Sequence, residues 1–250
     1  MKQKLIAGNW KMNGSLAANE ALVHGVQQGL AQALGGKHAQ VAVCVPAAYL
    51  SQVQQLVKGS GVDLGSQDVS AHEQGAYTGE ISAAMLKDFA VRYAIVGHSE
   101  RRQYHQEADE QVAEKALQVL DSDMIPVICV GESADERNSG RAQEVVCGQI
   151  AKQVSVLQDR LADCLIAYEP VWAIGTGKVA SADIAQDMHR HIRLQLAEFD
   201  LDVASHVGIL YGGSVNPDNA VELFAMPDID GGLVGGASLN PQDFLAICQA

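Results

Sequence analysis

Four side chains that could move a proton, or support its movement through charge and hydrogen bonds, stand at the ends of short apolar runs of the sequence. Asn9 and Lys11 follow the first such run. His98 follows a run near the middle of the chain, and Glu169 follows a later one. Partial desolvation is expected to raise the pKa of the Glu169 carboxylate towards working pH, which suits a general base, and an inward ammonium attracts an anion. These residue types predict proton abstraction from a carbon atom of a small anionic substrate.

Each of these residues has a more ordinary interpretation when it is taken alone. Glu169 would be a solvated carboxylate at a loop start, and Lys11 would be a surface charge. His98 would be structural, although Ser99 can cap a short helix that starts near Glu100. The positive end of that helix would disfavour the imidazolium and leave a neutral donor for a carbonyl oxygen. The shared position after apolar runs favours one site.

Two glycine pairs near the end of the chain predict an anion site. YGGSV contains Ser214, and LVGGAS contains Gly235 and Gly236. Each pair exposes backbone N–H groups after an apolar run, and Asn216 with Pro217 then opens a helix. One pair alone would indicate only a tight turn. Two pairs after the last two runs predict a phosphate site built from loops.

The segment that follows Glu169 has the composition of a lid. It combines apolar residues with two glycines and is long for a connection between a strand and a helix. A loop that folds over the ligand explains this better than a static one. Its tail also matches a G-x-G-x-x-A nucleotide pattern, but too far from the preceding strand to support that function. The lid residues are Pro170, Val171, Trp172, Ala173, Ile174, Gly175, Thr176, Gly177 and Lys178.

Eight short apolar runs must carry these residues, and they alternate with stretches of helical period. The helical stretches include 107–120, 140–157 and 181–199. Eight strand-helix units in 250 residues, with no linker between them, predict one domain over 1–250. An α/β fold of the (β/α)8 barrel type is favoured, although an open doubly wound sheet fits the same alternation. The runs begin at Lys4, Gln40, Val62, Arg92, Ile125, Cys164, His206 and Asp230.

Composition narrows the class of partner. A net charge of −13 and a pI of about 4.9 argue against a nucleic-acid-binding protein. The five cysteines show neither disulfide nor metal-type spacing, which predicts buried thiols in a reducing compartment. No apolar stretch is long enough for a membrane span or a signal peptide. We therefore expect a cytoplasmic protein with no membrane partner and no metal.

The motifs AGNWKMNG, GHSERR, AYEPVWAIGTGK, YGGSV and LVGGASL, in this order, resemble the triosephosphate isomerase family over essentially the whole chain. The resemblance implies a TIM barrel without a cofactor, acting in glycolysis and gluconeogenesis. It would interconvert dihydroxyacetone phosphate and glyceraldehyde 3-phosphate through an enediolate. Glu169 would move the proton and His98 would act on the carbonyl oxygen.

The same resemblance assigns the supporting residues. Lys11 would balance charge with help from Asn9, and Glu100 would position Lys11. Backbone N–H groups would bind the phosphate as the lid closes over it and excludes water; they belong to Gly175, Ser214, Gly235 and Gly236.

The resemblance also implies a homodimer formed through the loop 67–80. Thr78 would then reach towards the partner's active site. Two departures from the family pattern are Asp68, where many relatives have Asn, and Val179 at a variable hinge of the lid. Asp68 leaves the detail of the dimer contact open.

Two other functions fit parts of the pattern. The first is a Schiff-base aldolase using Lys11 or Lys178, although neither lysine lies inside a predicted strand. The second is a barrel that binds sugar phosphates without catalysis. Trapping of substrate on a lysine by borohydride would identify the first. Tight phosphate binding without exchange of solvent protons into the substrate would identify the second.

Overall fold

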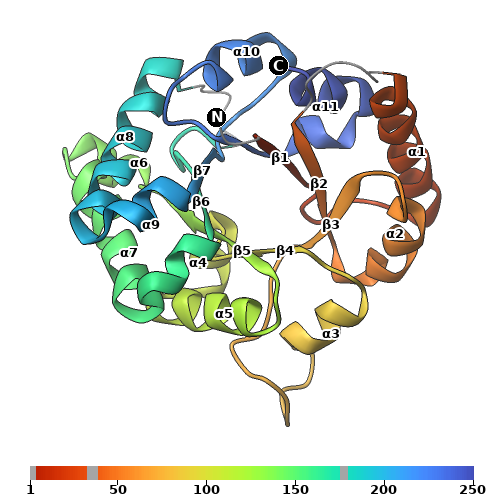
Figure 1. The fold of residues 1–250 in the computed structure, drawn as a ribbon, viewed down its shortest axis with the longest axis horizontal. Helices are drawn as coiled ribbons and strands as arrows, with labels where there is room; N and C mark the ends of the chain where they lie inside the picture. Colours follow the sequence, from red (N-terminus) through yellow and green to blue (C-terminus); the bar gives the residue numbers. More distant parts are fainter. Residues whose placement is uncertain (1–3, 33–38, 175–179) are drawn as a thin grey trace.

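The computed structural model describes residues 4–32, 39–174 and 180–250, and its eight described strands close into a parallel barrel (Figure 1). The strands follow one another round the barrel in chain order, which confirms the predicted (β/α)8 class over an open sheet. Each predicted apolar run contains one strand. The strands are β1 Leu5–Asn9, β2 Gln40–Val45, β3 Val62–Ser66, β4 Tyr93–Val96, β5 Ile125–Val130, β6 Leu165–Tyr168, β7 Gly208–Tyr211 and β8 Gly231–Val234.

Helices form a ring outside the strands (Figure 1). The predicted helical stretch 140–157 starts slightly later, because Gly140 adopts a positive φ of 75° between two separate helices. The α-helices are α1 Leu16–Gln32, α2 Leu50–Val57, α3 Ala83–Asp88, α4 Ser99–His105, α5 Asp109–Asp121, α6 Ala134–Asn138, α7 Ala142–Leu157, α8 Ala182–Phe199, α9 Leu201–His206, α10 Pro217–Phe224 and α11 Pro241–Cys248. Short 3₁₀ turns are η1 Ala47–Tyr49, η2 Gln158–Asp163 and η3 Gly236–Leu239.

Side chains fill the inside of the barrel, so the barrel is a packed core and not a pore. Leu5 and Ala7 of β1 belong to this inner cluster, whereas Ile6 between them packs outwards among the helices. Such alternation is the period of two expected for a strand covered on both faces. Because the interior is filled, space for a ligand is left at the ends of the barrel.

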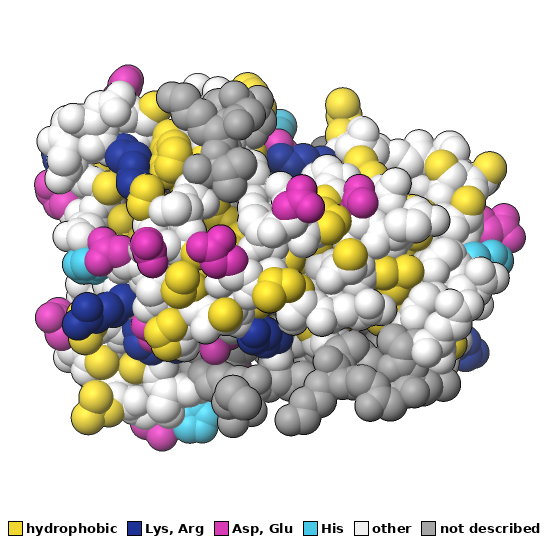
Figure 2. Space-filling model, turned by 90° about the horizontal axis from the view of Figure 1, so that it is seen from above, with side chains coloured by type: hydrophobic (Ala, Val, Ile, Leu, Met, Phe, Trp, Pro, Cys, Tyr) yellow, Lys and Arg dark blue, Asp and Glu magenta, His cyan; other side chains and the backbone are white. Residues whose placement is uncertain are grey.

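All five cysteines are free thiols, and four of them are buried. In the described part of the chain, no helix is both long and apolar enough to cross a membrane. On the side of the molecule in Figure 2, acidic and basic side chains lie interspersed, without an extended basic patch among those described.

Four charged side chains form a closed ring beside α4. Lys115 Nζ lies 2.7 Å from Asp68 and 2.5 Å from Glu107, and Arg101 lies 2.9 Å from Asp68 and 2.5 Å from Glu107. Lys115 and Glu107 keep only 4% and 3% of their side-chain surface exposed. The ring ties α4, which follows His98, to α5 and to the loop after β3. Asp68 is thus engaged within its own chain.

Glu107→Gln is expected to destabilise the fold by about 3–5 kcal/mol at neutral pH. The substitution removes one of the two carboxylates that contact the buried Lys115 ammonium. Burial alone would raise the pKa of Glu107, but Lys115 and Arg101 hold it below its ordinary value of 4.5. Its ionised form therefore stabilises the fold above pH 4.5, and this contribution is lost as the pH falls through the lowered pKa.

Urea unfolding of both proteins between pH 3 and pH 8 measures this difference. The gap between the native chain and Glu107→Gln should be largest near pH 7 and should shrink below pH 4.5. Glu114→Gln, at an exposed position of α5, is the control and should change little. A gap that stays constant over the whole pH range would show that the charge of Glu107 is not what stabilises the ring.

Candidate active site

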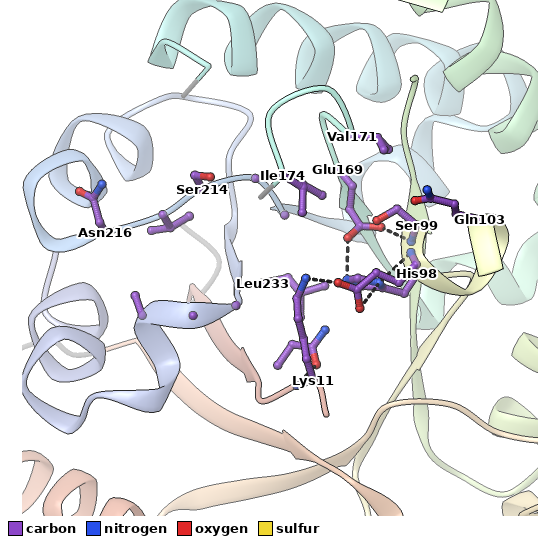
Figure 3. Close-up of a pocket in the computed structure, with 18 of the residues that line it drawn as sticks. Lys11, His98, Ser99, Gln103, Glu169, Val171, Ile174, Ser214, Asn216 and Leu233 are labelled. Atoms are coloured by element: carbon purple, nitrogen blue, oxygen red, sulfur yellow. Dashed lines mark hydrogen bonds and ion pairs between the residues drawn. The ribbon is translucent and has the colours of Figure 1, made fainter. Parts of the chain in front are cut away.

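A cavity of about 870 Å³ opens at the carboxyl ends of the strands, where parallel barrels place their sites. Asn9, Lys11, His98 and Glu169 all line it, although they come from the ends of three different strands. Figure 3 shows the Lys11 and Glu169 side chains converging on His98. The structure therefore brings the carboxylate, the imidazole and the ammonium to one cavity, as expected from the sequence.

The Glu169 carboxylate touches both the imidazole and the backbone of α4. Its Oε1 lies 2.9 Å from Nε2 of His98, and its Oε2 accepts a hydrogen bond of 2.8 Å from the backbone N–H of Ser99. Glu169 and His98 are only 2% and 6% exposed. Both groups therefore lie within reach of a single three-carbon molecule.

The orientation of the His98 ring follows from the start of α4. The backbone N–H of Glu100 donates to Nδ1 of His98 at 3.2 Å. Since Nδ1 accepts this hydrogen bond, the single proton of a neutral ring belongs on Nε2. The start of α4 therefore meets the ring as expected, and Nε2 lies on the cavity side, 2.9 Å from Oε1 of Glu169.

The pKa values of the pair are set by two opposing influences. Burial alone would raise the pKa of Glu169, but His98, the Ser99 N–H and Lys11 together hold it below its ordinary value. Burial alone would lower the pKa of His98, but the Glu169 carboxylate outweighs burial and raises it. The expected rise in the pKa of Glu169 and the expected neutral state of His98 are therefore both wrong for this arrangement of the site.

Lys11 enters the cavity from a strained backbone position. Its φ is 51°, which residues other than glycine rarely adopt, and its N–H donates to Oδ1 of Asn9 at 3.0 Å. Its Nζ lies 2.5 Å from Oε1 of Glu100. Glu100 thus contacts Lys11, as the resemblance implies, while 29% of the Lys11 side chain stays exposed to the cavity.

The opposite side of the cavity offers backbone donors. Ser214, Gly235 and Gly236 line it, and Figure 3 shows Ser214 and Asn216 across the cavity from Lys11 and His98. None of the backbone N–H groups of Ser214, Gly235 and Gly236 has a hydrogen-bond acceptor among the described residues. Free N–H groups on two neighbouring loops fit an anion such as phosphate.

The described part of the predicted lid covers Pro170 to Ile174. Val171 and Ile174 line the cavity, and Trp172 donates from Nε1 to Glu132 at 2.8 Å. Arg137 stacks on the Trp172 ring at 4.5 Å. This end of the predicted lid therefore has polar anchors outside the cavity. The remaining predicted lid residues Gly175, Thr176, Gly177 and Lys178 lie outside the described residues.

Sequence reasoning missed several residues that shape the site. Glu132 stands just after β5 and contacts both Trp172 and the Tyr168 hydroxyl. The rule that located Glu169, a carboxylate directly after an apolar run, would have found Glu132 too. Gly131 and Gly212 could not be found by this rule. They matter because a side chain at either position would collide with Glu169.

Gly212→Ala is expected to lower kcat about 100-fold, because its methyl group would lie 2.9 Å from Cγ of Glu169 and displace the carboxylate. The matched control is Gly148→Ala on α7, where an added methyl group meets nothing within 4 Å. That change should leave kcat intact and stabilise the helix by about 0.5–1 kcal/mol. Steady-state kinetics and thermal unfolding measure both. Equal kcat in the two variants would show that Glu169 tolerates the displacement.

The loop 67–80 projects beyond the ring of helices between β3 and α3 (Figure 1). Residues 72–80 are all exposed, Thr78 among them, and the rings of His72 and Tyr77 stack with centroids 3.8 Å apart. Over the described residues, no group of three or more His, Cys, Asp or Glu side chains is arranged to hold a metal ion.

The fold and the cavity together define a barrel enzyme that gathers a carboxylate, an imidazole and an ammonium beside an anion site. The family model of triosephosphate isomerase matches residues 4–250. A triosephosphate isomerase from Polynucleobacter asymbioticus is 72% identical over 253 residues, covering 100% of both chains. One from Paracidovorax citrulli is 56% identical over 249 residues, covering 100% of this chain and 98% of the relative. The chain belongs to the triosephosphate isomerase family.

Proposed function

We propose that the chain interconverts dihydroxyacetone phosphate and glyceraldehyde 3-phosphate, with Glu169 as the base, His98 as the partner of the carbonyl oxygen and Lys11 as the counter-charge. The observation that carries these roles is the contact of 2.9 Å between Glu169 and His98 inside the cavity that Lys11 lines. Family membership over nearly the whole chain supports this reaction over an aldolase or a binding protein.

Binding begins with the phosphate. The free N–H groups of Ser214, Gly235 and Gly236 donate hydrogen bonds to its oxygens on one side, and the Lys11 ammonium attracts it from the other. A local positive site is required because the protein carries a net charge of −13. Gly175, which lies outside the described residues, is proposed to add a further N–H group.

Glu169 becomes a stronger base when it leaves its present partners. In this arrangement His98 and the Ser99 N–H stabilise its charged form. A carboxylate that moves from these donors to the C–H bond of a substrate keeps the burial but loses the stabilising contacts, so its pKa rises. It then takes a proton from C1 of dihydroxyacetone phosphate and returns it to C2.

The same movement returns His98 to a neutral donor. Once the Glu169 carboxylate is withdrawn, burial and the Glu100 N–H on Nδ1 both oppose the imidazolium. Nε2–H then donates to the substrate carbonyl oxygen and stabilises the negative charge that develops there. Lys11 lies on the same side of the cavity and stabilises both the phosphate and the enediolate.

The lid protects the intermediate. An enediolate released early would expel phosphate, so water must be excluded until the proton is returned. Val171 and Ile174 supply apolar surface at the cavity, and Trp172 anchors this end of the segment through Glu132. We propose that 170–178 closes over the bound substrate as one unit.

The chain is further proposed to act as a cytoplasmic homodimer through the loop 67–80. Support comes from the projection of this loop, from the exposure of residues 72–80 and from the free thiols. Thr78 would reach the partner's cavity. Sedimentation of the purified chain at micromolar concentration should give a dimer, and a monomer of full activity would rule out this role of the loop.

The direct test of the reaction is a coupled assay with purified chain and dihydroxyacetone phosphate. The expected result is turnover that 2-phosphoglycolate, which resembles the enediolate, inhibits by competition. Binding of 2-phosphoglycolate without turnover would instead favour the non-catalytic barrel. Borohydride inactivation in the presence of substrate would favour an aldolase acting through a lysine.

A further inference from the structure

The carboxamide of Gln67 joins the loop after β1 and the end of β2 to the segment after β3, at the mouth of the barrel. Gln67 directly follows β3, and its Nε2 donates to the carbonyl oxygen of Lys11 at 2.9 Å and to that of Cys44 at 3.0 Å. Both acceptors are carbonyl oxygens, so only the NH₂ end of the amide can face them, and its two hydrogens match the two acceptors. One side chain thereby connects the ends of β1, β2 and β3.

The Lys11 backbone needs such support. A φ of 51° at a residue with a Cβ persists only where the surrounding structure holds it. The Lys11 N–H is held by Asn9, and the N–H of the preceding Trp10 donates to the Cys44 carbonyl at 3.1 Å. Gln67 supplies the remaining contact, on the carbonyl of Lys11 itself. Both sides of the Lys11 Cα are therefore fixed by side-chain amides.

We infer that Gln67 is a positioning residue that holds Lys11 in its left-handed conformation and so aims the ammonium at the anion site. The inference rests on the role proposed above for Lys11. A Cβ placed on Gly235 would lie 3.4 Å from Cε of Lys11. The lysine side chain therefore runs close to the loop after β8 that is proposed to bind the phosphate. If the Lys11 backbone relaxes to a negative φ, the side chain leaves this path.

Gln67→Met keeps the length of the side chain and removes both donors. It should lower kcat/KM and weaken the binding of 2-phosphoglycolate, by about 100-fold for a displacement near 1 Å. The matched control is Gln27→Met, which removes a similar half-buried contact to the carbonyl of Leu56, between α1 and α2. It should stay within about twofold of the native chain. Equal losses in the two variants would overturn the inference.

A cycle of binding measurements separates positioning from general loosening. If Gln67 acts through Lys11, Gln67→Met should weaken 2-phosphoglycolate binding no further once Lys11→Met is present. If the double variant instead lost affinity for 2-phosphoglycolate by the product of the two single losses, the inference would be contradicted. Because the cycle measures binding alone, it decides the role of Gln67 even if the native chain proved inactive, which would remove the proposed reaction instead.

Gln67→Glu provides a second test should the methionine variant fail to fold. Its ionised carboxylate would face two carbonyl oxygens, whereas the protonated acid restores one donor. The kcat/KM of this variant, relative to the native chain, should therefore rise as the pH falls from 8 to 5.5. A ratio that is flat with pH would contradict the positioning role.

Discussion

Glu169→Gln is expected to lower kcat about 10⁴-fold, because the amide cannot accept the proton that the reaction must move. Glu169→Asp should lose about 100-fold or more, since the shorter side chain withdraws the base by the length of a methylene group. Both variants should still bind 2-phosphoglycolate, because the phosphate contacts come from other residues. The coupled assay and calorimetric titration measure these quantities.

A matched control separates chemistry from folding in this test. Glu114→Asp, on the exposed side of α5, should leave kcat unchanged. Thermal unfolding of Glu169→Asp should stay cooperative, since the Ser99 N–H and His98 remain available to the carboxylate. Full activity in Glu169→Asp or Glu169→Gln would remove Glu169 from its role.

Lys11→Met should lower kcat/KM about 1000-fold, because the ammonium contributes both to phosphate binding and to the charge of the enediolate. Its effect should appear in KM and in kcat together, unlike that of Glu169→Gln. The loss of one partner from the Lys11–Glu100 pair should cost little stability, since 43% of the Glu100 side chain is exposed.

Lys58→Met is the control for the charge change, since it removes the same charge at an exposed position after α2. It should leave both constants near their native values at 0.1 M salt, where charges of the surface are screened over about 10 Å. If Lys58→Met and Lys11→Met had similar effects, the general charge of the protein would explain binding, and Lys11 would have no special part.

Much of the fold was predictable because strands buried on both faces leave continuous apolar runs. All eight runs became strands, and residues that follow β1, β4, β6, β7 and β8 line the cavity. Parallel barrels place their sites at the carboxyl ends of the strands, and this rule predicted that Lys11, His98 and Glu169 share one site.

The contacts between those residues were not predictable in the same way. A sequence can suggest that Glu169 is buried, which raises its pKa, but it does not reveal that His98 and the Ser99 N–H outweigh burial. Likewise, the hydrogen bond from Gln67 to the Lys11 carbonyl depends on the positive φ of Lys11. No residue spacing in the sequence indicates that conformation. Glu132 is different, since its place after β5 was visible and was overlooked.

The central claim is that one carboxylate carries the proton between the two carbons. Conversion of dihydroxyacetone phosphate in D₂O, with the aldehyde trapped as it forms by oxidation at C1, tests it most directly. A carboxyl proton exchanges with solvent, so we expect deuterium at C2 in a substantial fraction of the product. Product that holds only protium at C2, as an internal hydride shift would give, would contradict it.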